Sequence, residues 1–565
     1  MLSRPGLTSF LEELYVGRVR WDLLDPFPVQ DEDDRRAGDA AAAGFERFLR
    51  ERVDPTEVDL HGRLPEGLLD ELRARGYGRL GIEPELGGLG LSPLNVFRLL
   101  ELAASWSPPV ALLLAIQAGF GAGAYLPVLP EGPLRDVIRR RVAEGAIFAD
   151  ADTEAIGAAN RLRATVATPV DGGDAYLLTG EKICIGNAPV ADFLAVSATV
   201  REEGREGVRI FFVDADSPGL RVTARHEFMG LKGAINGTLA LDAVRVPRER
   251  MLVGPEDEWR LSPELSAISA RARVYVVGAP ALAIAKLCIR WAREFARRRF
   301  VDGRGLGDYD EIQRLVAISL AEVFAVETVI HWGLLAGRDG AVNVAFEQSA
   351  VKNVSSVTCW RIVDRTMSLL AAEGYETAPS KARRGAQPLP LERFFRDARA
   401  LRIAGGVDFQ VDSWAAERLL TYYYPPPHDE PRGAVPECPR LSPRNREHLR
   451  VVSKEAEALA RTCLRLSRRY PDVQELLARE DLVISLNRIA DELFTMSAAL
   501  ARAARLSEAE PAAQGLADVY CTAATERLAA LRRLVAEREE PDYGSLSDAW
   551  LAGKAMRFLL GDGTT

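Results

Sequence analysis

Gly230-Leu231-Lys232-Gly233-Ala234-Ile235-Asn236-Gly237-Thr238 lies near the end of a block, Ile147 to Gly254, whose pattern differs from the rest of the chain. In this block β-branched and alternating runs are separated by turn signals. The runs include 176–179 (YLLT), 193–196 (FLAV) and 209–213 (RIFFV), and the turns include 171–174 (DGGD) and 217–219 (SPG). The block is therefore predicted to be a β-domain.

Helical patterns lie on both sides of this block. Before it, Leu64-Pro65 opens a helix that continues with apolar residues at helical spacing. After it, periodic stretches run through 272–299, 311–335 and 344–372, and then, beyond a proline-rich segment, through 449–466 and 486–503. We predict a mainly α protein with a central β-domain. Its parts are an N-terminal helical domain (1–146), the β-domain (147–256), a four-helix bundle (257–423), a linker (424–445) and a C-terminal helical domain (446–565).

Composition excludes several functional classes. The chain has 565 residues, 47% of them hydrophobic, and a net charge of −9 without a basic stripe, which argues against disorder and against nucleic acid as the partner. Its six cysteines and five histidines are scattered, so we expect reduced thiols, a cytoplasmic location, no metal site and no histidine-based triad. The apolar stretch Val110 to Pro127 contains Gln117 and is predicted to be a buried helix rather than a membrane span.

Short motifs near the boundaries between the helical and β-domains resemble those of the acyl-CoA dehydrogenase family. Gly230 to Thr238, followed by Asp242-Ala243-Val244-Arg245-Val246-Pro247, resembles the family's G-[IL]-[KR] segment and its D-V-R-V-P strand end. Further matches are Asp152-Thr153-Glu154 with Gly157, Gly180 to Asn187, and Glu392 to Arg399. Asp25-Pro26-Phe27-Pro28 and the appended helices, including Leu486 to Asp491, are similar to the very-long-chain branch.

The resemblance implies a helical domain, a barrel-like β-domain, a four-helix bundle and, in this branch, an extra C-terminal helical bundle. It also implies a flavin-dependent oxidoreductase acting on CH-CH bonds, with FAD between the β-domain and the second helical domain and an acyl thioester beside the flavin. A homodimer, or a hetero-oligomer with a related chain, and an electron-transfer flavoprotein as acceptor follow from the same resemblance. In that chemistry a glutamate removes the α-proton while a hydride leaves the β-carbon.

Several residues match the family's flavin and substrate contacts. Thr153 matches a hydroxyl aimed at the pyrimidine edge, and Arg297 with Phe300 matches the R-x-x-F that meets the ADP half of FAD. The residues that the resemblance assigns to the cofactor are Thr153, Glu154, Gly157, Asn187, Arg297 and Phe300. Arg271 is assigned to the substrate end or to the orientation of the active-site loop.

The family's catalytic base has no counterpart at its usual place. A thioester α-proton is weakly acidic, so a carboxylate must be held close to it. Gly405 stands where the glutamate of the family's E-G-T triplet is expected. Some members supply the base from the start of the second helical domain, but Ile268 to Arg273 contains no carboxylate. Asp408 is the nearby substitute that the sequence offers.

Other groups that face the chemistry are also replaced. Cys184 stands for the tryptophan beside the flavin, Gly186 for the threonine near N5, Ala159 for the loop serine and Val407 for the threonine of the triplet. Residues 368–372 (SLLAA) replace the family's Q-x-x-G-G. These replacements do not affect the motifs near the domain boundaries, which define the fold.

Three functions stay open at this point. The first is an FAD-dependent oxidoreductase that works without the usual base. Its substrate could be a β-keto acid that forms a carbanion by losing carbon dioxide, with electrons passing to an electron-transfer flavoprotein or to oxygen in secondary metabolism. The second is a non-catalytic subunit or scaffold that pairs with an active relative. The third is a non-redox thioester catalyst, and membrane association through the appended domain also stays open.

Overall fold

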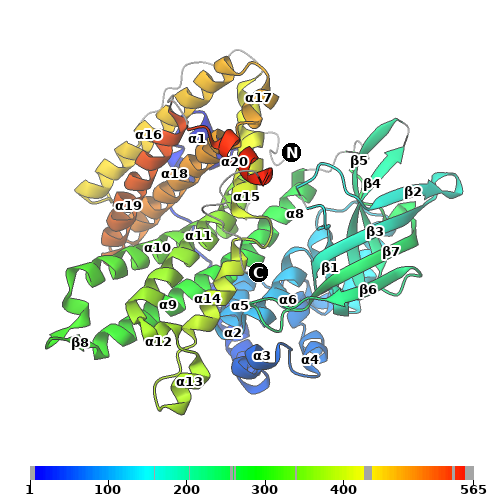
Figure 1. Cartoon of the computed structure of the whole chain (residues 1–565), viewed down its shortest axis with the longest axis horizontal. Coiled ribbons are helices and arrows are strands. Elements are labelled where there is room, and N and C mark those ends of the chain that lie inside the picture. The colour runs from blue at the N-terminus through cyan, green and yellow to red at the C-terminus, as the bar shows by residue number, and fades with distance from the viewer. Residues whose placement is uncertain are drawn as a thin grey trace.

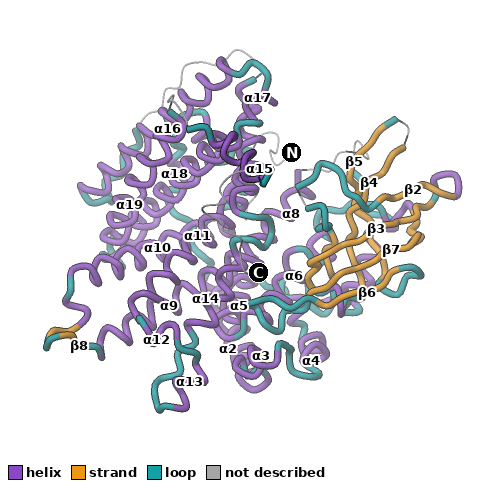
Figure 2. The backbone as a smooth tube through the Cα atoms, in the orientation of Figure 1, coloured by secondary structure: helices purple, strands orange, loops and turns teal. Residues whose placement is uncertain are grey.

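The computed structural model describes residues 7–157, 159–202, 204–254, 259, 263–337, 340, 342–424, 435–536 and 541–553, without the Ser266 side chain. The β-domain and the C-terminal helices lie at opposite ends of the molecule, with the long helices of the bundle between them (Figure 1). Strands are almost confined to the β-domain, as the tube view shows (Figure 2). The predicted fold class, mainly helical with a central β-domain, is confirmed.

The N-terminal part is helical, as predicted. Its helices are α1 (Phe10–Tyr15), α2 (Glu32–Arg52), α3 (Pro55–His61), α4 (Leu68–Ala74), α5 (Pro93–Trp106), α6 (Pro108–Gly119) and α7 (Pro133–Ala143). Four of them begin with proline in the first turn, where the missing N–H has no intrahelical partner to lose. Asp31 caps α2 by accepting hydrogen bonds from the N–H groups of Asp33 and Asp34.

The β-domain is one curled sheet of seven strands. They are β1 (Phe148–Ala151), β2 (Val166–Val170), β3 (Ala175–Gly186), β4 (Phe193–Glu202), β5 (Arg205–Asp214), β6 (Leu220–Arg225) and β7 (Asn236–Pro247). The order is β1-β4-β2-β3-β7-β6, and β5 pairs with β4. Short β1 runs parallel to β4, with Asp150 opposite Ala195. Ala149 and Ala151 point into the core of the sheet, whereas Phe148 belongs to a cluster shared with the helices.

The second helical region is built from α8 (Pro263–Arg273), α9 (Ala279–Arg298), α10 (Asp310–Leu335), α11 (Ala345–Leu370), α12 (Ala372–Tyr375), α13 (Ala378–Arg383), α14 (Leu391–Leu401) and α15 (Asp408–Leu420). A π-helical turn, η8 (Val274–Gly278), joins α8 to α9. A small hairpin, β8 (Phe300–Val301) and β9 (Arg304–Gly305), follows α9. The turn between α14 and α15 contains Gly405.

The appended helices are α16 (Pro443–Arg469), α17 (Val473–Leu477), α18 (Glu480–Leu506), α19 (Ala512–Val535) and α20 (Tyr543–Leu551). The apolar spacings predicted within 449–466 and 486–503 lie inside α16 and α18. Residues 425–434 of the proline-rich linker lie outside the described residues. The Phe494 ring of α18 packs against Phe10 of α1 and Trp332 of α10, so the appended part shares its core with the main body.

Three helical stretches are long and apolar enough to cross a membrane by length and composition alone: Pro108–Tyr125, Pro263–Arg298 and Asp310–Leu335. Between 61% and 83% of their most apolar windows is buried inside the protein. The first contains most of the stretch predicted to be a buried helix, and α6 accounts for much of it.

Candidate active site

The turn between α14 and α15 is held by two cations from neighbouring helices. Arg273 at the end of α8 donates from Nε to the Gly405 carbonyl at 2.8 Å. Lys352 of α11 donates from Nζ to the Gly406 carbonyl at 2.6 Å and to the Arg402 carbonyl at 3.3 Å. Burial lowers the pKa of Lys352 to about 8. The position expected to carry the glutamate is therefore fixed by its backbone.

Arg273 occupies the space into which a side chain at position 405 would extend. Gly405 has a φ of +69°, and a Cβ built there would lie 3.4 Å from Cγ of Arg273. A residue with a side chain rarely adopts that φ. The φ therefore disfavours a glutamate at this place, and its side chain would contact Arg273.

Asp408, the substitute suggested by the sequence, is engaged in local bonds. Its Oδ2 accepts from Arg402 Nε at 2.8 Å, and its Oδ1 accepts from the Phe409 N–H at 2.9 Å. Burial alone would raise the pKa of Asp408, but the hydrogen bond and charge of Arg402 lower it below its usual value. The carboxylate thus lies in the first turn of α15 and pairs with Arg402 of the turn before it.

Two arginines of α8 divide the roles that the resemblance gave to Arg271 alone. Arg273, one residue before the π-helical turn, makes the hydrogen bond to the loop. Arg271 instead lines a cavity together with Tyr275. The assignment of Arg271 to the substrate end therefore stays a proposal, while the hydrogen bond that orients the loop comes from Arg273.

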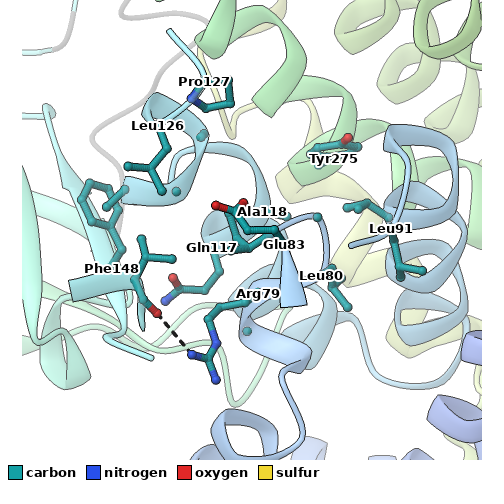
Figure 3. Close-up of a pocket in the computed structure, with 18 of the residues that line it drawn as sticks. Arg79, Leu80, Glu83, Leu91, Gln117, Ala118, Leu126, Pro127, Phe148 and Tyr275 are labelled. Atoms are coloured by element: carbon teal, nitrogen blue, oxygen red, sulfur yellow. Dashed lines mark hydrogen bonds between the residues drawn. The ribbon is translucent and has the colours of Figure 1, made fainter. Parts of the chain in front are cut away.

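That cavity has a volume of about 200 Å³ and lies where the N-terminal helices, the β-domain and α8 meet. Figure 3 shows Gln117 and Ala118 of α6, Leu126, Phe148 of β1 and Tyr275 around it. Most of the wall is apolar, whereas Nε2 of Gln117 is buried and has no hydrogen-bond partner in the described structure. The cavity can take an apolar group with a polar end.

Glu154 is buried within the β-domain, where it pairs with a lysine. Its Oε1 lies 2.8 Å from Nζ of Lys182, and both side chains are almost fully buried. The backbone N–H groups of Ala164 and Thr165 also donate to its carboxylate, at 2.6 and 2.9 Å. Burial would raise the pKa of Glu154, but these bonds lower it to about 2. The carboxylate therefore fixes the loop that carries Thr153 and Gly157.

The other predicted flavin contacts fall into two groups. Asn187 is buried and donates from Nδ2 to the carbonyls of Leu113 and Phe148, both at 3.3 Å, which joins the β-domain to α6. Thr153 accepts a backbone bond from Ile183, and its hydroxyl has no partner among the described residues. Arg297 and Phe300 lie exposed at the end of α9. Thr153, Arg297 and Phe300 are thus free to meet a ligand.

The residues around Gly186 bear on whether a flavin fits. Oδ1 of Asn236, the β7 partner of Gly186, is buried and unpaired among the described residues, which leaves an acceptor for a polar ring edge. Cys184 lies 3.6 Å from Nδ1 of His226 and is exposed. Against this, a Cβ on Gly186 would lie 2.5 Å from Cδ1 of Ile116, so that side chain fills the space beside the glycine. The free Thr153 hydroxyl and the unpaired amide oxygen fit a flavin edge.

Asp150 was missed by sequence reasoning. It lies on β1 three residues before Thr153 and is partly exposed. Burial and then the Asp152 charge raise its pKa to about 7, against the opposing charges of Lys182 and Arg273. Asp150 lies between two alanines that face the sheet core, and this alternation predicts that its side chain points to the opposite face of the strand. The sequence alone does not show which residues lie against that face.

The chain has the helix, sheet, helix fold of flavin-linked acyl-thioester dehydrogenases. Family profiles described as the N-terminal, middle and C-terminal domains of acyl-CoA dehydrogenase match residues 38–127, 150–244 and 270–413. Probable acyl-CoA dehydrogenase FadE10 of Mycobacterium tuberculosis is 30% identical, over 93% of this chain and 85% of that protein. The chain belongs to the acyl-CoA dehydrogenase family, as its joint motifs indicated.

Two further likenesses agree with this. Cyclohexane-1-carbonyl-CoA dehydrogenase of Geobacter metallireducens is 29% identical, over 64% of this chain and 91% of that enzyme. A crystal structure of an acyl-CoA dehydrogenase complexed with FAD from Bacillus anthracis is similar with a TM-score of 0.72 at 19% identity. The superposition covers 96% of this chain and 95% of that structure, so the similarity of fold includes the appended helices.

Proposed function

We propose that this protein is an FAD-dependent oxidoreductase of an acyl thioester or a related β-keto acid that works without a loop glutamate. The observation that carries the proposal is Gly405 at φ +69° with the Arg273 side chain in the adjacent space. Family membership supports the acyl substrate and the cofactor, and the cavity lined by Arg271 supports a place for the acyl group.

FAD, when bound, supplies the two-electron acceptor. Thr153 would meet the polar edge of its ring system, and Asn236 offers an unpaired amide oxygen nearby. Arg297 and Phe300 are exposed at the end of α9, so they are accessible to the ADP group of a cofactor held by another chain. A homodimer, or a hetero-oligomer with a related chain, is therefore part of the proposal.

The loop chemistry favours a route in which the usual proton acceptor is unnecessary or lies elsewhere. A β-keto acid that loses carbon dioxide leaves its electron pair on carbon, and cations around the loop suit a carboxylate. Arg273 and Arg418 lie within electrostatic range of one another. An electron-transfer flavoprotein or oxygen would accept the electrons, in a cytoplasm that keeps the free cysteines reduced.

A non-catalytic subunit is the second candidate, and one contact favours it. Ile116 fills the space beside Gly186, close to where the family aligns its flavin. If that side chain stays in place, the chain would serve as a scaffold that completes the pocket of an active relative.

The visible absorbance of the purified protein, before and after incubation with FAD, tests the proposed function. We expect a flavin spectrum that bleaches anaerobically with one member of a panel of saturated acyl-CoA thioesters and β-keto acids. A protein that stays colourless after incubation and co-purifies with an active relative would instead support the scaffold.

A further inference from the structure

We propose that Asp150 of β1 is the proton-accepting catalytic residue of this site, in place of the glutamate missing from the loop. This inference rests on the proposed function, because the proton it takes is the α-proton of the acyl thioester. It moves the base from the helical domain to the β-domain.

The direction of the Asp150 side chain follows from the strand. Ala149 and Ala151 are fully buried in the core of the sheet, so Asp150 points to the opposite face. Phe148, two residues earlier on that same face, shares a hydrophobic cluster with Leu265 and Ile268 of α8. Asp150 therefore faces the junction between the β-domain and α8.

Arg273 connects that junction to Gly405, the position where the glutamate is missing. Arg273 ends α8, lies within electrostatic range of Asp150 and reaches the Gly405 carbonyl. The cavity proposed for the acyl group is walled by Phe148 on one side and by Arg271 and Tyr275 on the other. Asp150 lies two residues beyond Phe148 on the same face of β1, next to this wall of the cavity.

Asp150 is chemically available, in contrast to its acidic neighbours. Among the described residues no hydrogen bond or ion pair joins its carboxyl group. Asp152, next on the same face, is held by Arg163 at 2.8 Å and accepts from the Ser197 hydroxyl at 2.6 Å. Glu154 is held by Lys182, and Asp408 by Arg402.

The groups that face Asp150 come from three elements. Asp152 and Lys182 belong to the β-domain, Arg273 to α8, and Tyr125 to the 3-10 turn η4 (Ala122–Tyr125). Burial and the Asp152 charge favour the protonated form, and the two cations oppose them. A carboxyl group with a pKa of about 7 is well matched to proton transfer near neutral pH.

In the proposed step, the α C–H bond of the thioester breaks and an O–H bond forms on the Asp150 carboxylate. The electron pair of the C–H bond stays on the substrate as the thioester enolate, which the Arg273 charge stabilises. That pair becomes the α,β double bond as the β C–H bond breaks, and FAD, when bound, would accept the hydride that carries the two electrons of the β C–H bond.

Exchange of the α-hydrogen of a saturated acyl-CoA in deuterated water, measured by NMR on the FAD-loaded protein without an electron acceptor, tests this step. We expect Asp150→Asn to slow exchange by a factor of about 10² or more. Asp150→Glu should retain part of the rate, with a shifted pH midpoint. Asp216→Asn, the same change at an exposed position of the β-domain, should exchange like the natural protein.

In the natural protein the exchange rate should rise as pH increases through about 7, because the carboxylate form is the acceptor. FAD content and Tm, measured on every variant, separate loss of the base from loss of the fold. Asp150→Asn that binds FAD and exchanges at the natural rate would overturn the proposal. So would a natural protein that does not exchange but bleaches while releasing carbon dioxide from a β-keto acid; that result would leave the proposed function standing, whereas failure to bind FAD would remove both.

Discussion

At Gly405 a single backbone angle decides what the loop can carry. A side chain there would be strained by the φ of +69° and would also contact Arg273. The loss of the glutamate is therefore built into the surrounding structure and is more than an exchange of one residue.

We expect Gly405→Glu not to create an ordinary dehydrogenase and to lower the free energy of unfolding by about 1–3 kcal/mol, because a left-handed non-glycine residue is strained. Chemical denaturation and flavin bleaching with saturated acyl-CoA measure the two effects. Gly385→Glu is the matched control for backbone strain alone, since Gly385 has a φ of +74° and open space around it, and it should lose a similar stability without affecting the flavin assay. A Gly405→Glu protein as stable as the natural one and faster with acyl-CoA would contradict the structural reading.

The buried pair Glu154–Lys182 gives a second prediction. Glu154→Gln leaves the Lys182 ammonium group buried without its directly bonded carboxylate, so we expect a loss of about 3–5 kcal/mol in unfolding free energy. Glu46→Gln, which removes an exposed pair with Arg50, should cost much less. Equal losses in the two variants would show that burial of the pair is unimportant.

The same pair has a defined pH dependence. The folded pKa of Glu154 is about 2, below the ordinary 4.5, so its stabilisation is complete above the ordinary value and is lost as pH falls toward 2. The difference in stability between the natural protein and Glu154→Gln should shrink over that range. Denaturation curves at a series of acidic pH values measure it.

At the scale of elements, the crossing of α6 and α8 positions the end of α8, and with it Arg273. A Cβ on Gly119 would lie 2.7 Å from Cα of Ala272, so the two helices touch backbone to backbone one residue before Arg273. Any side chain at position 119 would push the end of α8 away from the loop that Arg273 holds.

A pair of glycine substitutions tests this crossing. Alanine usually stabilises a helix by about 0.5–1 kcal/mol relative to glycine. We expect that gain for Gly44→Ala in α2, where nothing lies within 4 Å, and a loss of stability and of bound FAD for Gly119→Ala. Thermal unfolding and flavin content are the measurements, and a gain at both positions would refute the close contact.

The helices and strands could be predicted from the sequence more accurately than the packing between them. Alternating runs located the strands, and three-and-four spacing located α16 and α18, because burial on one face leaves a periodic trace. The π-helical turn at Val274–Gly278 left no such trace, and it breaks the 3.6-residue relation between α8 and α9. The choice between Arg271 and Arg273 could not be made without it.

The base position shows the same limit. Gly405 was identified because the loop motif is local in the sequence. Asp150 could not be found in this way, since it meets Arg273 only when β1 is placed against α8, more than a hundred residues later in the chain.

For the whole molecule, a buried acidic pair joins the appended helices to the main body. Asp412 of α15 accepts from Asn353 at 2.6 Å and from Arg488 of α18 at 2.8 Å, and Asn487 bridges it to Asp491. Burial, and then the charge of Asp412, raise the pKa of Asp491 well above its usual value. This interface therefore holds a proton that the unfolded chain would release.

Because the folded state binds that proton, the stability of the natural protein should fall as pH rises above the ordinary aspartate pKa. We expect a smaller decline in Asp491→Asn, so that the Tm of this variant rises relative to the Tm of the natural protein as the pH becomes more alkaline. Asp481→Asn, an exposed position on α18, should keep the natural slope. Parallel curves for all three proteins would contradict the prediction.

Helix α1 depends on partners that come more than three hundred residues later in the chain. Ser9 donates to Glu347 at 2.7 Å, the Tyr423 hydroxyl donates to the Tyr15 carbonyl, and the Phe10 ring lies 6.0 Å from that of Phe494. On the ribosome, α1 must wait uncovered until α18 emerges. Packing of α1 is therefore a late step of folding, and a premature stop before α18 would leave α1 unprotected as well as the helices next to the stop.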